Sequence, residues 1–140
     1  MATQLNPYLN FAGTAREAMT FYSEVFGGEL DLNTFAEFGV NDDPADAEKI
    51  MHGQVTSPSG LVLMGADVTS GMEHVEGNNF AVSLSGEDET ELRGYWDKLA
   101  DGATIVEPLV KAPWGDTFGM LVDRFGINWM VNIAGSTDES

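Results

Sequence analysis

The clearest pattern in the chain is an alternation of apolar and polar residues that occurs twice, in residues 5–11 and in residues 79–84. Alternation with a period of two residues is typical of a strand that is buried on one face only. We therefore expect a half-buried strand near the start of each half of the chain. Its apolar positions are Leu5, Leu9 and Phe11 in the first half and Phe80, Val82 and Leu84 in the second.

Each of these strands is followed by a segment in which apolar residues have helical spacing. The first helix is predicted to start at Thr14-Ala15-Arg16-Glu17, a capping-box sequence, and to end at Gly27-Gly28. The second is predicted to start within residues 85–89 and to stop at Asp101-Gly102. Both helices carry an aromatic pair shortly before they stop, Phe21-Tyr22 and Tyr95-Trp96.

Three strands are predicted after each helix, and the last two of them form a hairpin. In the first half these strands are residues 29–38, 49–56 and 61–66, with an acidic loop or short helical turn at residues 39–47. In the second half they are residues 103–109, 117–123 and 127–133. The hairpin glycines have the same spacing, from Gly53 to Gly60 and from Gly119 to Gly126. The chain therefore contains one supersecondary unit twice, which predicts an α+β fold of two βαβββ units.

The length of 140 residues suits one domain with a substantial core. We expect a single domain over residues 1–140, with unit one at about 4–66, a polar linker at 67–78, unit two at about 79–134 and a tail at 135–140. The apolar strand positions would pack under the two helices. Besides those named above, they include Ile127, Trp129, Val131 and Ile133.

The chain is strongly acidic, with 23 Asp and Glu against six Lys and Arg and a formal net charge of −17. Such a charge repels nucleic acids and anionic membranes, so neither is expected as a partner. It would attract a cationic ligand, or it would serve only as a solvated surface that keeps the protein in solution. The chain has no cysteine, and no apolar run approaches the ~20 residues that span a bilayer. We expect a cytoplasmic protein without a signal peptide.

The polar positions of the alternating strands suggest where a ligand would bind. A solvated strand face usually carries charged residues, but these positions hold mainly amides and thioethers. We interpret them as the wall of a concave, hydrogen-bonding cavity, with an ordinary solvent face or a subunit interface as the alternatives. The positions are Asn6, Tyr8, Asn10, Asn79, Ser83, Asn128, Met130 and Asn132.

Several segments of the chain are similar to those of a known protein family. They are Asn6-Pro-Tyr-Leu-Asn-Phe11, Phe21-Tyr22 with Phe26-Gly27-Gly28, Ile50-Met-His52, Trp114-Gly-Asp116 and Asp123-Arg-Phe-Gly-Ile-Asn-Trp-Met130. In this order they resemble the vicinal oxygen chelate superfamily, which includes glyoxalase I, extradiol dioxygenases, and bleomycin- and fosfomycin-resistance proteins. The resemblance is to its glyoxalase-like branch, formerly labelled 3-demethylubiquinone-9 3-methyltransferase-like. It covers nearly the whole chain and implies paired curved mixed sheets, helices on the outer face and a homodimer.

The resemblance also implies where a metal would bind. Metal-dependent members use His and Glu on the first and last strands of each unit, and the corresponding positions here are Asn6, Met64, Asn79 and Met130. Divalent cations of this kind prefer imidazole and carboxylate ligands, and none of the four positions supplies one. We therefore expect no metal ion and no cofactor, with the same asparagine and methionine pair in both halves.

The candidate ligand-binding residues are Tyr8, Asn10, His52, Asn79, Trp114 and Asn128. The orientation of His52 depends on the register of its hairpin. Pairing of Gly53 with Met64 would place His52 under the helix, whereas a bulge or an odd-length turn would place it in the cavity beside Gln54. Trp114 is either a lid that stacks on a ligand or a residue packed against the core. No catalytic residue is assigned.

These observations favour a metal-independent small-molecule binding protein of the glyoxalase and bleomycin-resistance type, with a ligand that is cationic if the acidic charge serves its capture. The alternative is a metal-dependent lyase, isomerase or dioxygenase of the same superfamily with displaced ligands, using His52 and an acid such as Glu37. A folded dimer without activity is a third interpretation, so enzymatic activity stays open. The methyltransferase label finds no support, because the chain has no glycine-rich strand-to-helix turn for a nucleotide-like cofactor.

Overall fold

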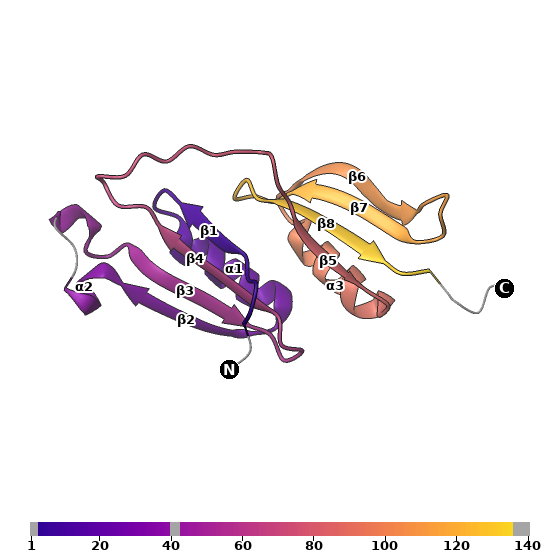
Figure 1. The fold of residues 1–140 in the computed structure, drawn as a ribbon, viewed down its shortest axis with the longest axis horizontal. Helices are drawn as coiled ribbons and strands as arrows, with labels where there is room; N and C mark the ends of the chain where they lie inside the picture. The colour runs from indigo at the N-terminus through magenta and orange to yellow at the C-terminus, as the bar shows by residue number, and fades with distance from the viewer. Residues whose placement is uncertain (1–2, 40–42, 136–140) are drawn as a thin grey trace. The chain divides into compact units, whose positions relative to one another are not determined.

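The structure is a computed structural model that describes residues 3–39 and 43–135. It divides into two compact units, Met1–Glu76 and Gly77–Ser140 (Figure 1). Among the described residues, no helix combines the length and the apolar character needed to cross a membrane.

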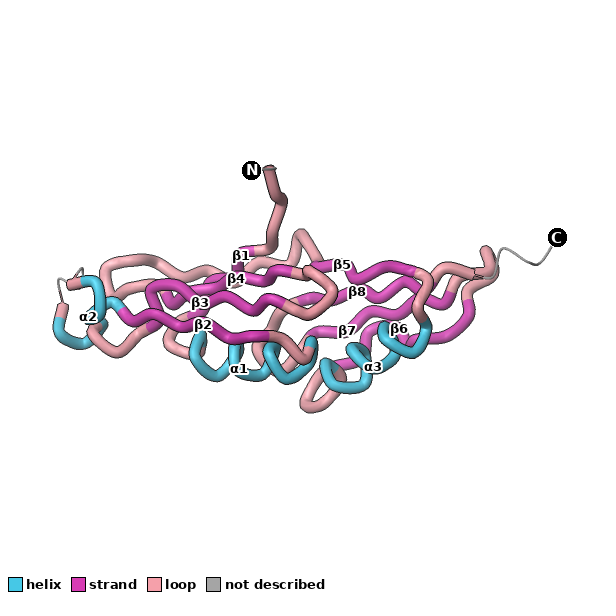
Figure 2. Tube along the Cα trace, turned by 90° about the horizontal axis from the view of Figure 1, so that it is seen from below, coloured by secondary structure: helices cyan, strands magenta, loops and turns pink. Residues whose placement is uncertain are grey.

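Unit one contains a four-stranded mixed sheet with the strand order β1-β4-β3-β2. Strand β1 runs parallel to β4, and the other neighbours are antiparallel. Helix α1 lies against one face of this sheet (Figure 2). The elements are β1 (Tyr8–Phe11), α1 (Ala15–Phe26), β2 (Glu29–Thr34), α2 (Phe35–Phe38), the 3-10 turn η1 (Pro44–Asp46), β3 (Ile50–Thr56) and β4 (Val62–Asp67).

Unit two repeats this arrangement with the strand order β5-β8-β7-β6. Its parallel pair is β5 with β8, and helix α3 packs on one face through β5 and β8. The elements are β5 (Val82–Gly86), α3 (Glu89–Leu99), β6 (Thr104–Lys111), β7 (Thr117–Val122) and β8 (Asn128–Ile133). The predicted α+β fold of two βαβββ units is confirmed.

In both units the helix packs closely on a glycine of the third strand. A Cβ atom on Gly53 would lie 3.1 Å from Met19 Cγ, and one on Gly119 would lie 2.8 Å from Trp96 Cη2. Met19 is fully buried in α1, and Trp96 is buried in α3. The glycines therefore let a large helical side chain reach the sheet, and the face of each sheet away from its helix remains open.

The first strands are shorter than the alternation predicts. Strand β1 begins at Tyr8 and β5 begins at Val82, so Leu5 and Phe80 lie outside them. Leu5 is 100% exposed and Phe80 is 60% exposed, which contradicts the prediction that they belong to the core. Both precede the first residue of their strand, so strand pairing does not hold them against the helix.

The predicted strand 29–38 is wrong after Thr34. The hydroxyl of Thr34 accepts a hydrogen bond from the backbone N–H of Glu37, which caps a single helical turn. Gly39 ends this turn with a positive φ of 63°. The apolar residues Phe35 and Phe38 resemble a strand in the sequence, but the local cap determines their conformation.

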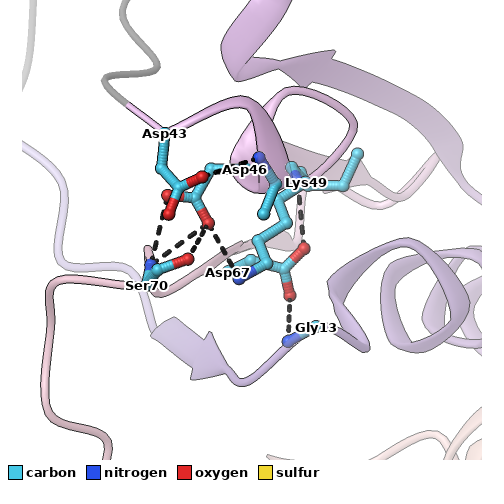
Figure 3. A network of polar contacts seen from close by, with 8 residues as sticks. Gly13, Asp43, Asp46, Lys49, Asp67 and Ser70 are labelled. Atoms are coloured by element: carbon cyan, nitrogen blue, oxygen red, sulfur yellow. Dashed lines mark hydrogen bonds and ion pairs between the residues drawn. The ribbon is translucent and has the colours of Figure 1, made fainter.

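The capping box predicted at Thr14 does not form, because the Thr14 side chain makes no cap hydrogen bond. The buried carboxylate of Asp67 replaces it and accepts hydrogen bonds from the amides of Gly13 and Ala15 at 2.9 Å (Figure 3). Its other oxygen accepts from the amide of Ile50 at 3.0 Å. Asp67 was predicted to open the linker, but it is the last residue of β4 and joins three segments of unit one.

A second buried aspartate holds the segment before β3. The carboxylate of Asp46 lies 2.9 Å from Lys49 Nζ and accepts hydrogen bonds from the hydroxyl and amide of Ser70 (Figure 3). The contact with Lys49, followed by those with Ser70, lowers the pKa of Asp46 below its ordinary value. This carboxylate therefore connects η1 to the segment that follows β4.

Candidate functional site

The register of the first hairpin determines the orientation of His52. Gly53 pairs with Gly65 and Thr56 pairs with Val62, so residues 57–61 form a connection of five residues. This is the odd-length turn that the sequence left open as one alternative. His52 consequently lies on the open face with Gln54, away from α1.

The open face of unit one combines an aromatic ring, an imidazole and amides. The ring centroids of Tyr8 and His52 are 6.0 Å apart with an interplanar angle of 40°. Tyr8 is 48% exposed and His52 is partly exposed. Each of these two side chains can donate a hydrogen bond to a ligand or accept one from it. The strand positions on this face are Tyr8, Asn10, Glu29, Asp31, Asn33, His52, Gln54, Thr56, Val62, Met64 and Ala66.

The open face of unit two is more apolar. Met120 and Met130 are direct partners on the antiparallel strands β7 and β8, and Phe118 is the partner of Asn132. Asn128 donates a hydrogen bond from Nδ2 to the carbonyl of Phe80 at 3.3 Å. The strand positions on this face are Ser83, Ser85, Thr104, Glu107, Val110, Phe118, Met120, Val122, Asn128, Met130 and Asn132.

Of the alternatives for Trp114, the structure shows an exposed ring. Trp114 is 66% exposed, and its ring centroid lies 6.3 Å from that of Phe118. The loop is closed by hydrogen bonds from Ala112 N to the Asp116 carbonyl and from Gly115 N to the Ala112 carbonyl. A tight turn therefore holds this tryptophan next to the open face.

The side chain of Asp116 ties the Trp114 loop to the end of β8. Its carboxylate accepts hydrogen bonds from Asn132 Nδ2 at 3.0 Å and from the amide of Gly135 at 2.8 Å. The bond from Asn132, followed by that from Gly135, lowers the pKa of Asp116 below its ordinary value, against a smaller effect of burial. The loop is thus anchored by a carboxylate that stays ionised at neutral pH.

The candidate residues from the sequence fall into two groups, one in each unit. Tyr8, Asn10 and His52 share the open face of unit one. Asn128 belongs to the open face of unit two, with Trp114 beside it, whereas Asn79 is exposed and precedes β5. The ring contacts join Tyr8 to His52 and Trp114 to Phe118, and Asn79 is in neither contact.

Sequence reasoning missed Phe118, Met120 and Glu107 as residues of the site. The period of two in residues 117–122 could have found Phe118 and Met120, because they alternate with the buried Leu121. Glu107 could not have been found this way. It becomes the partner of Met120 only because β6 has irregular pairing on both sides of it.

The sheet register shows which residues lie beside the two methionines predicted to correspond to metal ligands of the superfamily. The first-strand residue opposite Met64 is Tyr8, and the one opposite Met130 is Ser83. Asn6 lies two residues before Tyr8 and Asn79 lies four residues before Ser83, so both are outside β1 and β5. Their correspondence to metal-ligand positions stays a prediction. Met64 and Met130 do occupy equivalent places.

This donor set does not fit a divalent cation. The predicted positions carry thioethers and amides, and the residues opposite the methionines carry a phenol and a hydroxyl, whereas Zn²⁺, Mn²⁺ and Fe²⁺ prefer imidazole and carboxylate. In the part of the chain that the structure describes, no three His, Cys, Asp or Glu side chains gather where they could hold a metal ion.

Comparison with known proteins gives relatives over nearly the full chain. The sequence pattern of the 3-demethylubiquinone-9 3-methyltransferase family matches residues 3–132. The crystal structure of protein PA1353 from Pseudomonas aeruginosa is 34% identical, with a TM-score of 0.80 over 96% of this chain and 100% of that one. A putative 3-demethylubiquinone-9 3-methyltransferase, PhnB protein, from Bacillus cereus is 26% identical, with a TM-score of 0.75 over 94% and 100%. Protein YjdN of Escherichia coli is 26% identical over 92% of this chain and 94% of its own length.

A more distant structure has the same fold. The glyoxylase/bleomycin resistance protein/dioxygenase domain from Frankia is 16% identical and has a TM-score of 0.64 over 98% of this chain and 94% of that domain. At this identity the likeness concerns the fold alone. Together with the family match, it agrees with the repeated βαβββ unit and with the resemblance found in the sequence. The chain therefore belongs to the 3-demethylubiquinone-9 3-methyltransferase family, and it shares its fold with the glyoxylase/bleomycin resistance protein/dioxygenase domain.

Proposed function

We propose that this protein binds a small molecule on its open sheet faces without using a metal ion. The observation that carries the proposal is the pair of Tyr8 and His52, whose rings lie 6.0 Å apart on the open face of unit one beside amide side chains. The residues proposed to contact a ligand are Tyr8, Asn10 and His52 in unit one, and Asn79, Trp114 and Asn128 in unit two.

The chemistry of the open face supports binding of a polar ligand. Phenol, imidazole and carboxamide groups both donate and accept hydrogen bonds, so they can orient a ligand with several polar atoms. They are partly or fully exposed, so a ligand can reach them. No Lys or Arg occupies the strand positions of this face in the described residues, which leaves no basic group to select an anion.

The charge of the chain supports a cationic ligand. A net charge of −17 attracts cations over the whole surface and increases their rate of encounter. The same charge opposes nucleic acids and anionic membranes as partners. As part of this proposal the protein is a homodimer in the cytoplasm, and sedimentation equilibrium and cell fractionation would test these two points.

Thermal stabilisation by ligands tests the proposal. A panel of cationic, neutral and anionic metabolites and antibiotics is added to the full chain, and the unfolding temperature is recorded. A ligand at 100 times its Kd adds about 2.7 kcal/mol to the free energy of unfolding. We expect at least one compound to raise the unfolding temperature of the wild type, and the Tyr8→Phe and His52→Ala variants to lose most of the shift.

The control is His74→Ala, which changes the other histidine. His74 lies between β4 and β5, where its Nε2 is 3.7 Å from a carboxylate oxygen of Glu76. This variant should retain the full ligand-induced shift. If no compound stabilises the wild type, or if all three variants respond alike, the proposed binding site is wrong.

Metal analysis tests the second part of the proposal. The protein is purified without chelators, and its Ni, Zn, Fe and Mn contents are measured by mass spectrometry. We expect far less than one metal ion per chain and no loss of ligand binding in the presence of EDTA. A stoichiometric metal whose removal abolishes binding would instead support the alternative, a metal-dependent lyase, isomerase or dioxygenase with displaced ligands.

A further inference from the structure

We propose that the open face of unit two binds an alkylated organic cation, such as a quaternary ammonium group, between Trp114, Phe118 and Glu107. This inference rests on the proposed binding function and specifies the chemical class of the ligand. The two faces differ in their ring pairs, which are Trp114 with Phe118 here and Tyr8 with His52 in unit one.

The aromatic part of this site is exposed and well placed for a cation. Trp114 is 66% exposed, and its ring centroid is 6.3 Å from that of Phe118 with an interplanar angle of 57°. Tilted rings leave both π-faces partly accessible, and a π-face attracts a cation within about 6 Å of the ring centroid. The other tryptophans, Trp96 and Trp129, are buried in the core. Trp114 is therefore the tryptophan available to a ligand.

The loop that presents Trp114 is already ordered by its own hydrogen bonds. Asp116 accepts from Asn132 and Gly135, and its carbonyl accepts from Ala112 at 2.6 Å. Gly115 allows the tight turn with a positive φ of 104°. Because the loop is fixed before binding, a ligand does not have to supply the free energy for ordering it.

Glu107 supplies a negative charge on the same face. It is the strand partner of Met120, and Val110, three residues later on β6, is the partner of Phe118. Glu107 is exposed, and its carboxylate has no hydrogen bond or ion pair with any residue that the structure describes. Among the described strand positions of this face it is the only charged residue, so its carboxylate is available to a ligand.

The surroundings of this carboxylate favour an alkylated cation over a metal ion. Met120 and Met130 face each other across β7 and β8, and Val110 lies opposite Phe118. Thioether, aliphatic and aromatic surfaces suit methyl or methylene groups around a weakly hydrated nitrogen. A hydrated Ca²⁺ or Mg²⁺ ion would require several oxygen ligands, and Glu107 alone cannot provide them.

A pair of isosteric probes tests the role of the charge. Choline and 3,3-dimethylbutan-1-ol have the same shape, but only choline carries a positive nitrogen. Binding of each to the full-length protein is measured by the quenching of tryptophan fluorescence and by saturation-transfer NMR, at a constant ionic strength of about 0.15 M. We expect choline to bind saturably, with an affinity about tenfold or more above that of the neutral alcohol.

Three variants locate the site. Trp114→Ala and Glu107→Gln should each weaken choline binding by about threefold to tenfold. Glu87→Gln makes the same change in net charge at an exposed glutamate between β5 and α3, and it should leave the affinity unchanged within about twofold. Circular dichroism and unfolding temperature establish that the variants fold.

The outcomes separate this inference from the proposed function. Equal affinity for choline and the neutral alcohol, or equal loss in Glu107→Gln and Glu87→Gln, would overturn the cation site. If choline does not bind while another compound binds in a Tyr8- and His52-dependent manner, this inference is wrong and the proposed function stands. If no compound of any charge binds, the proposed function fails as well.

Discussion

The indole Nε1 of Trp129 donates a 2.8 Å hydrogen bond to the carboxylate of Asp123 in the core of unit two. Trp129 is 1% exposed and Asp123 is 4% exposed. The other carboxylate oxygen accepts from the amides of Phe125 and Ile127 in the turn between β7 and β8. One side chain thus satisfies a buried tryptophan and closes a hairpin.

Asp123→Ala should therefore destabilise the protein severely. It removes three hydrogen bonds to a carboxylate and leaves the indole N–H of Trp129 buried without an acceptor, at a cost of about 3 kcal/mol or more. Urea unfolding measures the loss. Asp101→Ala is the control, because it breaks an exposed ion pair with Arg124 and should cost less than about 1 kcal/mol. Equal losses would show that the buried network adds nothing.

Substitution of Gly119 and of Gly94 by alanine should have opposite effects on the free energy of unfolding, because Trp96 packs closely on Gly119 only. In Gly119→Ala, the new Cβ would lie 2.8 Å from Trp96 Cη2 and 2.9 Å from Leu109 Cα, so the backbone must move. We expect a loss of about 1–3 kcal/mol in the free energy of unfolding. In Gly94→Ala, on α3, the new Cβ meets nothing within 4 Å. That change should stabilise the protein by about 0.5–1 kcal/mol, because alanine favours helix.

Asp67 and Thr14 both lie near the start of α1, and their substitution by alanine should cost very different amounts of stability. The sequence alone would predict the larger loss for Thr14. Asp67→Ala removes the acceptor for the amides of Gly13, Ala15 and Ile50 and should cost about 3 kcal/mol or more in chemical denaturation. Thr14→Ala should cost less than about 0.5 kcal/mol, because the Thr14 hydroxyl makes no capping bond. A large loss of stability in Thr14→Ala would instead show that the Thr14 side chain caps α1.

The lowered pKa of Asp116 predicts an effect of acid on the Trp114 loop. A carboxyl whose pKa is lower in the folded state adds stability above its unfolded pKa of about 4 and loses it as the pH falls through the folded value. The anchoring of the loop should therefore be complete at neutral pH and weaken below about pH 4. Asp46 adds a contribution in the same direction, since its pKa is also lowered.

Tryptophan fluorescence between pH 7 and pH 3 measures this effect. We expect the emission of Trp114 to change below about pH 4 in the wild type. Asp116→Asn should show the changed emission already at neutral pH and lose that part of the titration. Asp43→Asn, an exposed aspartate at the start of η1, serves as the control and should titrate like the wild type. The same titration in Asp116→Asn and the wild type would contradict the anchoring role.

The sequence could predict the sheet face of a site residue only in strands with a regular alternation of apolar and polar positions. Tyr8 and Asn10 alternate with the buried Leu9 and Phe11, so their face followed from the sequence. The face of His52 did not follow, because it depended on whether the hairpin turn held an even or an odd number of residues. The pairing of Glu107 with Met120 depended on irregularities in β6 that have no signature in the residue types.

What the sequence by itself determined was the repeated unit, its helices and most of its strands, because the periods of 2 and 3.6 residues are local consequences of burial on one face. It also predicts amides and thioethers, and neither His nor Glu, at the positions expected to correspond to metal ligands. Only the tertiary structure decided that Asp67 caps α1 and that Tyr8 lies opposite Met64. These contacts join residues far apart in the chain, and their partners are chosen by strand register and packing, which no local pattern encodes.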